Sequence, residues 1–340
     1  MSNKDVTLGG RTFQRLTLSD KELFSKYFKE TEYPTTFYFS NFDIIWGNSG
    51  FRDIALWKEM DGMLVVFNYN RRSKSLSLPV LPLGKGSPDH ISNVLVKALT
   101  LCREWNKGNN MAFVRGIDDL QYEFLRLSTM FRNHIRHKVL PGLERHISVQ
   151  NTVALPGKAY NDVRYARNKF YRKFPNALVR PVKDEDYMPL LELKKEWNRT
   201  AGTKYKKVWD DYFYQKILKY HKQLNHLILV IEIDGKLIAM ATGGFTPSGQ
   251  GWAGILKCLN EYEGASTVMY IEFAKEFHRL NPRAELINIG TDAGVRNKDG
   301  TSGLSIFKSK FRPVLSTKRI RLYLRRGSPG LKSEAEEHTP

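Results

Sequence analysis

Residues 227–242 read Leu227-Ile-Leu-Val-Ile-Glu-Ile233, then Asp234-Gly235, then Lys236-Leu-Ile-Ala-Met-Ala-Thr242. Two runs rich in aliphatic and β-branched residues flank a two-residue turn signal, an arrangement typical of an antiparallel β-hairpin. This stretch decides the fold class, because the segments on both sides of it show the period of amphipathic helices. We therefore expect an α+β fold built around the hairpin.

The segments around the hairpin predict one complete α+β unit in the C-terminal half. Apolar residues at helical spacing predict helices, and short apolar runs predict strands. The expected helices cover residues 160–174, 184–198, 209–220, 266–280 and 304–310, and the expected further strands cover 252–259, 285–289 and 319–324. A hairpin, a third strand, a helix and a diverging strand in this order are typical of the GNAT (acyl-CoA N-acyltransferase) fold.

The N-terminal half repeats this element order. Its expected helices cover 20–28, 37–46, 89–106 and 120–131, and its expected strands cover 53–59, 63–67, 75–80 and 111–114, with Asp61-Gly62 as the hairpin turn. The repetition predicts an internal duplication, although the two halves share only the order of elements. We expect two tandem GNAT-like domains, 1–148 and 149–326, each a mixed, mostly antiparallel sheet flanked by helices. The polar segment 327–340 is expected to be a disordered tail.

The charge balance predicts an anionic partner. The chain has 54 Lys and Arg against 35 Asp and Glu, which gives a net charge of +19 at pH 7. Nucleic acid and the anionic cytoplasmic leaflet both fit, because clustered cations gain from counterion release on the one and from the surface potential of the other. A solvated basic surface is the alternative that needs no partner.

The composition argues against several other classes of protein. The sequence contains no run of about 18 apolar residues and no secretory signal, so we expect a cytoplasmic protein. Cys102 and Cys258 each lie in an apolar segment, which favours buried reduced thiols over a disulfide. The histidines lack cysteine or carboxylate neighbours at ligand spacing, so no metal site is expected.

Two segments carry a resemblance to a known family. The first runs from Leu155-Pro-Gly157-Lys158 to Phe170 and opens a helix with a row of cations, and the second runs from Asn288 through Asp292 and Lys308 to Pro313. Together with Trp197, these segments resemble the C-terminal domain of phosphatidylglycerol lysyltransferases, a family of tandem GNAT folds. The specific motifs lie between about residues 153 and 323.

The resemblance implies a function. It implies transfer of an aminoacyl group from aminoacyl-tRNA to phosphatidylglycerol or to another small hydroxyl or amine acceptor. It also implies aminoacyl-tRNA as donor, no separate cofactor, and a location in the cytoplasm or at the inner face of the membrane beside anionic phospholipid. The amino acid, the acceptor and the oligomeric state stay open.

The basic helix is the expected seat of the tRNA acceptor end. Arg164 and Arg167 are three residues apart, and Lys169 continues the cationic surface beside the apolar stripe. The Arg167-Asn168 pair marks this helix in the family pattern. We therefore expect Arg164, Arg167 and Lys169 to bind substrate, whereas the alternative is a solvated helix face.

The second segment supplies the expected reactive groups. Aminoacyl transfer starts from an activated ester, so the enzyme must orient the acceptor, remove its proton and stabilise an oxyanion. Asp292 could accept that proton or anchor the α-ammonium of the aminoacyl group, and Lys308 could meet the terminal phosphate or the developing oxyanion. Asn288 and Lys310 are expected to bind substrate. The alternatives are a turn-capping aspartate and surface lysines.

Two further residues are weaker candidates for substrate binding. Trp197 could line the amino-acid pocket and Glu272 could face the cleft, although a core tryptophan and a solvent-facing glutamate are the simpler readings. The family commonly has an arginine after Gly303-Leu304, where this chain has Ser305, and the segment 295–302 is longer than usual. The acceptor pocket is therefore expected to differ from that of the family.

Coenzyme A is disfavoured as a cofactor. Gly84-Lys85-Gly86 has Leu81 at the position where the acetyl-CoA loop of GNAT enzymes carries a cation or an amide. Glu261-Tyr-Glu-Gly264-Ala265 has a glutamate at that position, which would face the pyrophosphate. Two rival functions stay open, namely an acyl-CoA-dependent N-acetyltransferase and a non-catalytic module that binds RNA or an anionic membrane.

Overall fold

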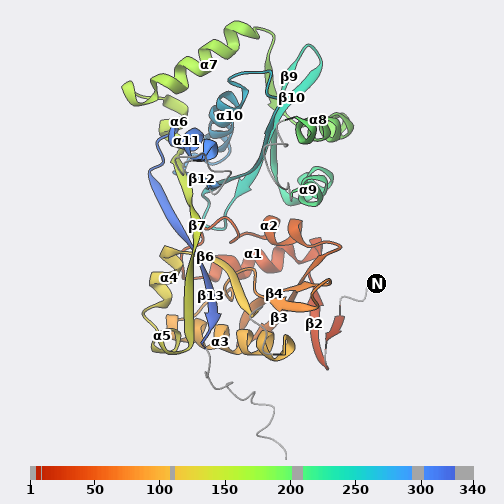
Figure 1. Ribbon diagram of the computed structural model, residues 1–340, viewed down its shortest axis with the longest axis vertical. Helices are drawn as coiled ribbons and strands as arrows, with labels where there is room; N and C mark the ends of the chain where they lie inside the picture. The colour runs from red at the N-terminus through yellow and green to blue at the C-terminus, as the bar shows by residue number, and fades with distance from the viewer. Residues whose placement is uncertain (1–4, 9, 108–111, 201–209, 293–301, 326–340) are drawn as a thin grey trace, which may run out of the picture. The chain divides into compact units, whose positions relative to one another are not determined.

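The computed structural model describes residues 5–8, 10–107, 112–200, 210–292 and 302–325 (Figure 1). The chain forms two compact units, one made of Met1–Leu140 with Lys318–Pro340 and the other of Pro141–Thr317. The predicted domains 1–148 and 149–326 rest on a duplicated element order and stay a prediction. The predicted tail 327–340 and all but Ser302 of the long segment 295–302 lie outside the described residues.

The first unit contains a five-stranded antiparallel sheet and a separate strand pair. The sheet has the order β1 (Asp5–Leu8), β2 (Arg11–Arg15), β3 (Asp53–Met60), β4 (Met63–Asn70) and β5 (Ser75–Ser77). The helices are α1 (Lys21–Glu30), α2 (Phe42–Asn48), α3 (Pro88–Trp105), α4 (Asp119–Leu125) and α5 (Thr129–His134). Strand β6 (Phe113–Asp118) pairs antiparallel with β13 (Leu315–Leu324). An isolated parallel bridge, Leu78 to Val114, connects the segment after β5 to β6.

The second unit has one mixed sheet with helices on both faces. Its strand order is β7 (Ile135–Ser148), β12 (Leu286–Thr291), β11 (Gly251–Cys258), β10 (Lys236–Phe245), β9 (Leu227–Ile233) and β8 (Leu178–Pro181). The other helices are α6 (Val149–Ala154), α7 (Asn161–Lys173) and α11 (Gly303–Ser309). Figure 1 shows α8 (Tyr187–Arg199) and α9 (Asp211–Leu224) on one face of this sheet and α10 (Ala265–Leu280) on the other. The α+β class is thereby confirmed.

Both predicted hairpin turns have the expected backbone. Asp61 and Gly62 have φ angles of 49° and 76°, and Asp234 and Gly235 have φ angles of 48° and 79°. Two consecutive residues with positive φ are required by the tight turns whose twist matches that of antiparallel strands. The register of β9 and β10 follows from the second turn, with Lys236 opposite Ile233.

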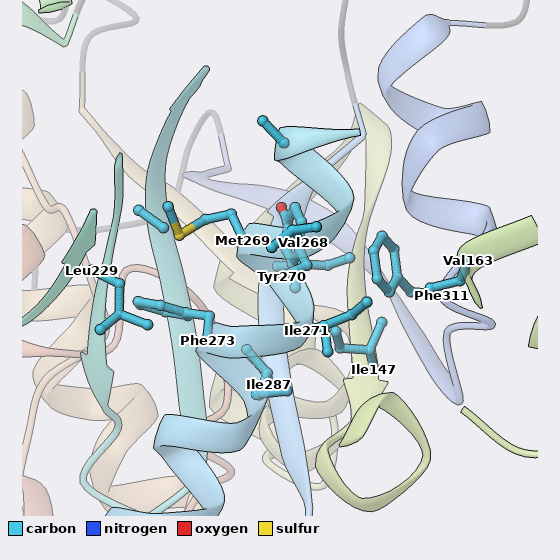
Figure 2. Packing of buried hydrophobic residues seen from close by; sticks show 14 of the residues in the cluster. Ile147, Val163, Leu229, Val268, Met269, Tyr270, Ile271, Phe273, Ile287 and Phe311 are labelled. Carbon is cyan, nitrogen blue, oxygen red and sulfur yellow. The ribbon is translucent and has the colours of Figure 1, made fainter. Parts of the chain in front are cut away.

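The core of the second unit lies between its sheet and α10. Figure 2 shows Phe273 of α10 beside Leu229 of β9 and Ile287 of β12, and Ile271 of α10 beside Ile147 of β7. These side chains are buried, and together they fix α10 across the strands. Burial of each large apolar side chain contributes about 1.5–3 kcal/mol to the free energy of unfolding.

Strands β11 and β12 diverge beneath α10. They pair in parallel only at Gly251 with Ile287 and at Trp252 with Asn288, and their remaining residues have no pairing with each other in the described register. Strand β12 instead pairs antiparallel with β7. The end of β12 is therefore separated from β11, and this separation leaves its last residues available to side chains from β7 and α11.

No helix of the described part of the chain combines the length and the hydropathy that crossing a bilayer requires.

Candidate active site

A β-bulge at the end of β12 creates the centre of the site. Asn288 lies opposite His146 and Thr291 lies opposite Glu144, so β12 has one residue more than β7 in this interval. Gly290 has a φ of 71°, which glycine adopts without the strain that a side chain would cause. The bulge turns the carbonyl groups of Gly290 and Thr291 toward α11.

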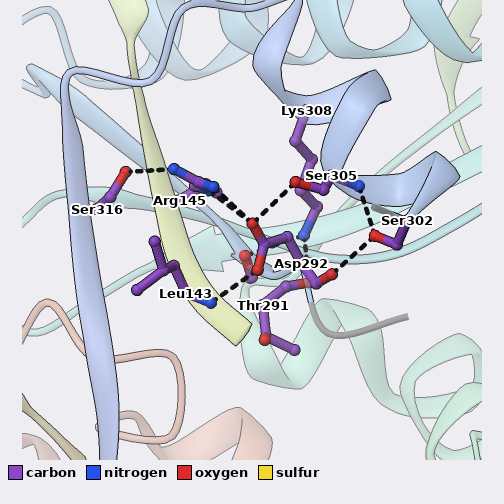
Figure 3. Close-up of polar contacts among 9 residues, drawn as sticks. Leu143, Arg145, Thr291, Asp292, Ser302, Ser305, Lys308 and Ser316 are labelled. Atoms are coloured by element: carbon purple, nitrogen blue, oxygen red, sulfur yellow. Dashed lines mark hydrogen bonds and ion pairs between the residues drawn. The ribbon is translucent and has the colours of Figure 1, made fainter. Parts of the chain in front are cut away.

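Lys308 of α11 fills the space in front of these two carbonyl groups. Its Nζ donates hydrogen bonds to the Gly290 oxygen at 2.9 Å and to the Thr291 oxygen at 2.7 Å (Figure 3). Only 4% of Lys308 is exposed. Burial disfavours the charged amine and lowers the pKa of Lys308 to about 7, against the opposite effect of the Asp292 and Glu144 carboxylates.

The geometry suits a lysine that exchanges a proton near neutral pH. A neutral amine has two N–H groups and one lone pair. The two carbonyl groups accept the two N–H groups, which leaves the lone pair to accept a proton. In the ammonium form the third N–H can instead donate to an oxyanion.

Asp292 lies beside Lys308 and is held by hydrogen bonds. Its Oδ1 accepts from the backbone N–H of Leu143 at 2.7 Å, and its Oδ2 accepts from Arg145 Nε at 2.9 Å and from Ser305 Oγ at 3.2 Å. Arg145 Nη2 completes an ion pair with Oδ2 at 2.7 Å. Burial acts to raise the pKa of Asp292, but these donors outweigh it and the pKa is lowered.

Asn288 fixes the bulge from the other side. Its Nδ2 donates to Glu144 Oε2 at 2.8 Å, and its Oδ1 accepts the backbone N–H of Gly290 at 2.8 Å. Asn288 and Glu144 are each 1% exposed. The structure thus brings three predicted site residues, Asn288, Asp292 and Lys308, into one cluster, with Asn288 as a buried support.

The three predicted cations of α7 make their contacts elsewhere in the second unit. Arg164 donates to the Leu155 carbonyl and to Asn161 Oδ1. Arg167 donates to Asn168 Oδ1, and Lys169 Nζ contacts both carboxylate oxygens of Glu263 at 2.8 Å. These contacts lie along α7 and at the loop before α10, and do not involve Asp292.

Trp197 lies in a different cluster, on the α8 side of the sheet. Lys257 Nζ is 3.5 Å from the centre of its indole ring, and Lys194 Nζ is 5.5 Å from it. Both lysines also pair with Asp210, at 2.8 Å and 2.6 Å respectively. The simpler reading, a tryptophan that packs inside the fold, agrees with its burial.

The remaining two predicted residues lie near helix surfaces. Glu272 of α10 accepts a hydrogen bond from Lys275 at 2.8 Å. Burial raises the pKa of Tyr171 on α7, and the charge of Glu272 raises it further. Lys310 follows α11 and is exposed. No described contact connects Glu272 or Lys310 to the Asp292 cluster.

The family model described as "Phosphatidylglycerol lysyltransferase, C-terminal" matches residues 86–323. The chain belongs to this family. The match covers the whole Asp292 cluster and both clusters of cations in the second unit. No curated protein sequence matches the chain.

Several solved structures have a similar fold. A Bacteroides thetaiotaomicron protein of unknown function has a TM-score of 0.76 at 18% identity, covering 92% of this chain and 99% of that one. The C-terminal domain of an Agrobacterium fabrum protein described as a lysylphosphatidylglycerol synthetase has a TM-score of 0.62 at 15% identity, covering 92% and 93%. FemX has a TM-score of 0.58 at 10% identity, covering 90% and 96%. At these identities the likeness shows the fold alone.

The site of this lysyltransferase-family chain includes residues that no sequence pattern marks. Arg145 is 147 positions away from Asp292, and Glu144 is 144 positions away from Asn288. Both lie on β7, in a segment that reads as neither strand nor helix by its apolar pattern. Only the pairing of β7 with β12 places these charges beside Lys308.

Proposed function

We propose that this protein transfers an aminoacyl group from aminoacyl-tRNA to phosphatidylglycerol or to another small hydroxyl or amine acceptor. The observation that carries the proposal is the buried amine of Lys308, which two carbonyl groups hold in place beside the Asp292–Arg145 pair. The family match supports the type of reaction. An acyl transfer from an already activated ester needs a proton carrier and an oxyanion partner, and a lysine with a pKa of about 7 serves both needs.

The proposed reaction is a direct transfer without a covalent enzyme intermediate. The acceptor hydroxyl or amine attacks the ester carbonyl carbon, and a bond from the acceptor to that carbon forms. Neutral Lys308 takes the acceptor proton as the tetrahedral oxyanion develops. The bond to the ribose oxygen of the tRNA then breaks, and Lys308 returns the proton to that oxygen. Atoms, charge and protons balance over the cycle.

Asp292 has a positioning role in this proposal. All the hydrogen bonds that it accepts favour its ionised form, and its lowered pKa makes it a poor proton acceptor. Its carboxylate instead fixes Arg145 and the start of α11, through Ser305. Arg145 is half-buried and also donates to Ser316, so its guanidinium has a fixed orientation. We assign Arg145 to stabilising negative charge near Lys308.

We also propose that the chain is a tandem GNAT protein. In the second unit a hairpin, a third strand, helix α10 and a parallel diverging strand follow one another. In the first unit β3, β4, β5, α3 and β6 follow the same order, and the Leu78–Val114 bridge is parallel as well. The repetition of both the order and the parallel contact supports the duplication.

Coenzyme A is a poor fit for the proposed site. The loop before α10 carries Glu263, which Lys169 neutralises, and Gly264 packs under α7. A Cβ at Gly264 would meet the Ala166 oxygen and the Phe170 Cβ at 3.0 Å. Helix α7 therefore lies against the loop where a GNAT enzyme would receive a pyrophosphate. The proposed donor is aminoacyl-tRNA without a further cofactor.

We keep α7 as the proposed binding site for tRNA, although binding there must replace hydrogen bonds that its cations already make. Arg164 and Lys169 already have hydrogen-bond partners within the second unit. A phosphate group must replace Glu263 at Lys169, which exchanges one exposed ion pair for another. Arg167 contacts only a neighbouring asparagine among its described hydrogen bonds and is the cation best placed to bind RNA on this helix.

The acceptor side is proposed to meet an anionic membrane surface. A groove of about 410 Å³ lies between the start of α8 and the end of α9. Leu190 and Leu218 form part of its apolar wall, and Lys183, Lys219 and Lys222 lie around it, with Asp184 as an acidic neighbour. An apolar groove with a basic rim is complementary to an anionic phospholipid, whose acyl chain is apolar and whose head group is negatively charged.

One experiment tests donor and acceptor together. The full chain is incubated with a mixture of tRNAs charged with labelled amino acids and with a lipid extract that contains phosphatidylglycerol, and the label is followed into organic-soluble and small-molecule products. Acetyl-CoA with free amine acceptors forms the second arm. Label leaving the tRNA for a lipid or small product supports the proposal, whereas acetyl transfer alone, or binding of RNA or vesicles with no product, contradicts it.

A further inference from the structure

One face of the first unit carries alternating arginines and aromatic rings. On β13 the side chains of Ile320, Leu322 and Leu324 are buried, so those of Arg319, Arg321 and Tyr323 point to the opposite side. On the neighbouring strand β6, Val114 is buried, while Arg115 is exposed and Phe113 half-buried. We call the set Phe39, Phe113, Arg115, Arg136, Arg319, Arg321 and Tyr323 the arginine–aromatic face.

Three of these arginines lie over aromatic rings. The Arg321 guanidinium carbon is 4.6 Å from the centre of the Phe113 ring, and that of Arg136 is 4.7 Å from the centre of the Tyr323 ring. Arg115 is 5.4 Å from the Phe39 ring. Each of these guanidinium groups thus lies against an aromatic ring, which restricts the arginine side chain before any ligand binds.

The arginines of this face are close enough to repel one another. Partial desolvation lowers the pKa of Arg115, and the like charges of Arg321 and Arg319 lower it further, against the opposing effect of Asp53. Arg321 Nε also donates to the backbone oxygen of Arg115 at 3.4 Å. A fold that gathers several arginines on one face produces a positive potential there, which favours the binding of anions.

We infer that the arginine–aromatic face binds an unpaired segment of an RNA, and this inference rests on the proposed use of aminoacyl-tRNA. Unpaired bases stack on aromatic side chains and on guanidinium planes, and arginine forks bind phosphate through two hydrogen bonds. The face offers both kinds of group in alternation. It belongs to the first unit, whereas the cations of α7 belong to the second.

The aromatic rings favour RNA over a lipid surface as the partner. Phe39, Phe113 and Tyr323 are half-buried within the strands and against their arginines. Rings held in this way can present an edge or a face to a base, but they cannot insert into the acyl region of a bilayer, as the exposed aromatic residues of membrane-binding helices do. The exposed arginines, Arg115 and Arg136, remain available to phosphate groups.

The test measures binding of uncharged RNA to the full chain, so that it needs no transfer activity. The probe is a short RNA hairpin with a single-stranded 3′ end CCA, compared with the same hairpin cut blunt. The variants are Arg115→Ala with Arg321→Ala, and Arg115→Lys with Arg321→Lys. The matched control is Arg126→Ala, because Arg126 is also exposed and lies 5.9 Å from a tyrosine ring in the same unit. Arg126 differs in that it follows α4 and forms an ion pair with Glu123.

The expected result has three parts. The alanine pair weakens binding of the overhang hairpin by about tenfold and flattens the plot of log K against log salt by about 1.4, since each lost contact to a single strand contributes about 0.7. The lysine pair keeps the salt slope but loses the preference for the overhang, because lysine neither stacks nor forks. Arg126→Ala binds like the wild type.

Three outcomes of the RNA-binding measurements would overturn the inference. These are wild-type binding of the overhang hairpin by the alanine pair, an equal loss for blunt and overhang hairpins, and an equal loss in Arg126→Ala. If the alanine pair keeps RNA binding but no longer binds phosphatidylglycerol vesicles, the face belongs to a lipid and the inference is wrong. Because the RNA probe carries no amino acid, this binding measurement can be interpreted even if the transfer assay detects no activity.

Discussion

The amine of Lys308 is buried, which disfavours its positively charged form and suits it to proton transfer. Burial disfavours the ammonium form, while Asp292 and Glu144 favour it, and the balance lowers the pKa of Lys308 to about 7. At neutral pH both protonation states are therefore populated. A group that both accepts and returns a proton during one reaction cycle works best with such a pKa.

The lowered pKa of Lys308 predicts how stability depends on pH. Between about pH 7 and pH 10.5 the unfolded chain holds a proton on this lysine that the folded chain lacks, so the free energy of unfolding rises with pH in this window. The difference between wild type and Lys308→Met, from urea unfolding at a series of pH values, is expected to increase by up to about 1.4 kcal/mol per pH unit.

A matched control separates this effect from other titrating groups. Lys195 on α8 is largely exposed and pairs only with its helix neighbour Glu192 among its described ion pairs. Lys195→Met should differ from wild type by the same free energy at every pH in the window. A difference between wild type and Lys308→Met that stays flat with pH would show that Lys308 keeps an ordinary pKa.

Single residues of the site were predictable only where a motif marks them. Asp292 and Lys308 belong to the segment that resembles the lysyltransferase family, and the structure brings them together. The orientation of Lys308 was not predictable, because it depends on the two carbonyl groups that the bulge turns inward. Glu144 and Arg145 carry no signal in the sequence, since their role arises from strand pairing over more than 140 residues.

At the scale of elements, the end of β12 decides the geometry of the site. The bulge adds one residue between the positions opposite His146 and Glu144, and Gly290 takes the left-handed conformation that makes the extra residue fit. Strand β12, helix α11 and strand β7 each supply part of the cluster. A change in the bulge should therefore move the carbonyl groups away from Lys308.

Gly290→Ala tests the bulge directly. An alanine at a φ of 71° costs about 1–2 kcal/mol. The free energy of unfolding of the variant, measured by urea denaturation, should therefore be lower than that of the wild type by this amount. The added Cβ would be 3.8 Å from Lys308 Nζ, an ordinary contact, so the loss comes from the backbone. We also expect the variant to lose the pH dependence of stability that Lys308 gives.

Gly303→Ala is the matched control for this element. Gly303 is the first residue of α11, and a Cβ there would meet nothing within 4 Å. Its replacement should leave stability unchanged or raise it by about 0.5 kcal/mol, because alanine favours the helix. Equal stability of the two variants would contradict the proposed strain at Gly290.

The apolar pattern predicted most elements of both units, and the exceptions have local causes. Strands β1 and β8 were missed because each has four residues and no buried side chain. Strands β2 and β7 were missed because their residues are mixed in polarity and show little alternation. The predicted helix 120–131 is two helices, since Ser128 accepts the Phe131 N–H and starts α5 anew. Long apolar runs such as β9 and β10 left no such ambiguity.

For the whole molecule, the proposed function rests on the family match, on the fold and on the buried amine of Lys308. Membership in the lysyltransferase family is shown by the match over residues 86–323. The sequence alone predicted the α+β class of the fold, because helices and strands follow from local patterns, while the duplication of the two halves stays a prediction. It could not predict where the charges meet, because that depends on which strands become neighbours.

The most direct test of the central claim is the pH dependence of the proposed aminoacyl transfer by the full chain. Single-turnover transfer from charged tRNA to its acceptor is measured from pH 5.5 to 9, with conditions in which the ester donor itself is stable for the time of the assay. The wild-type rate should rise with pH and level off above about pH 7, as Lys308 becomes neutral. Lys308→Met should lose this rise together with about a hundredfold of the rate, and Lys195→Met should keep both. An unchanged rate and profile in Lys308→Met would contradict the account.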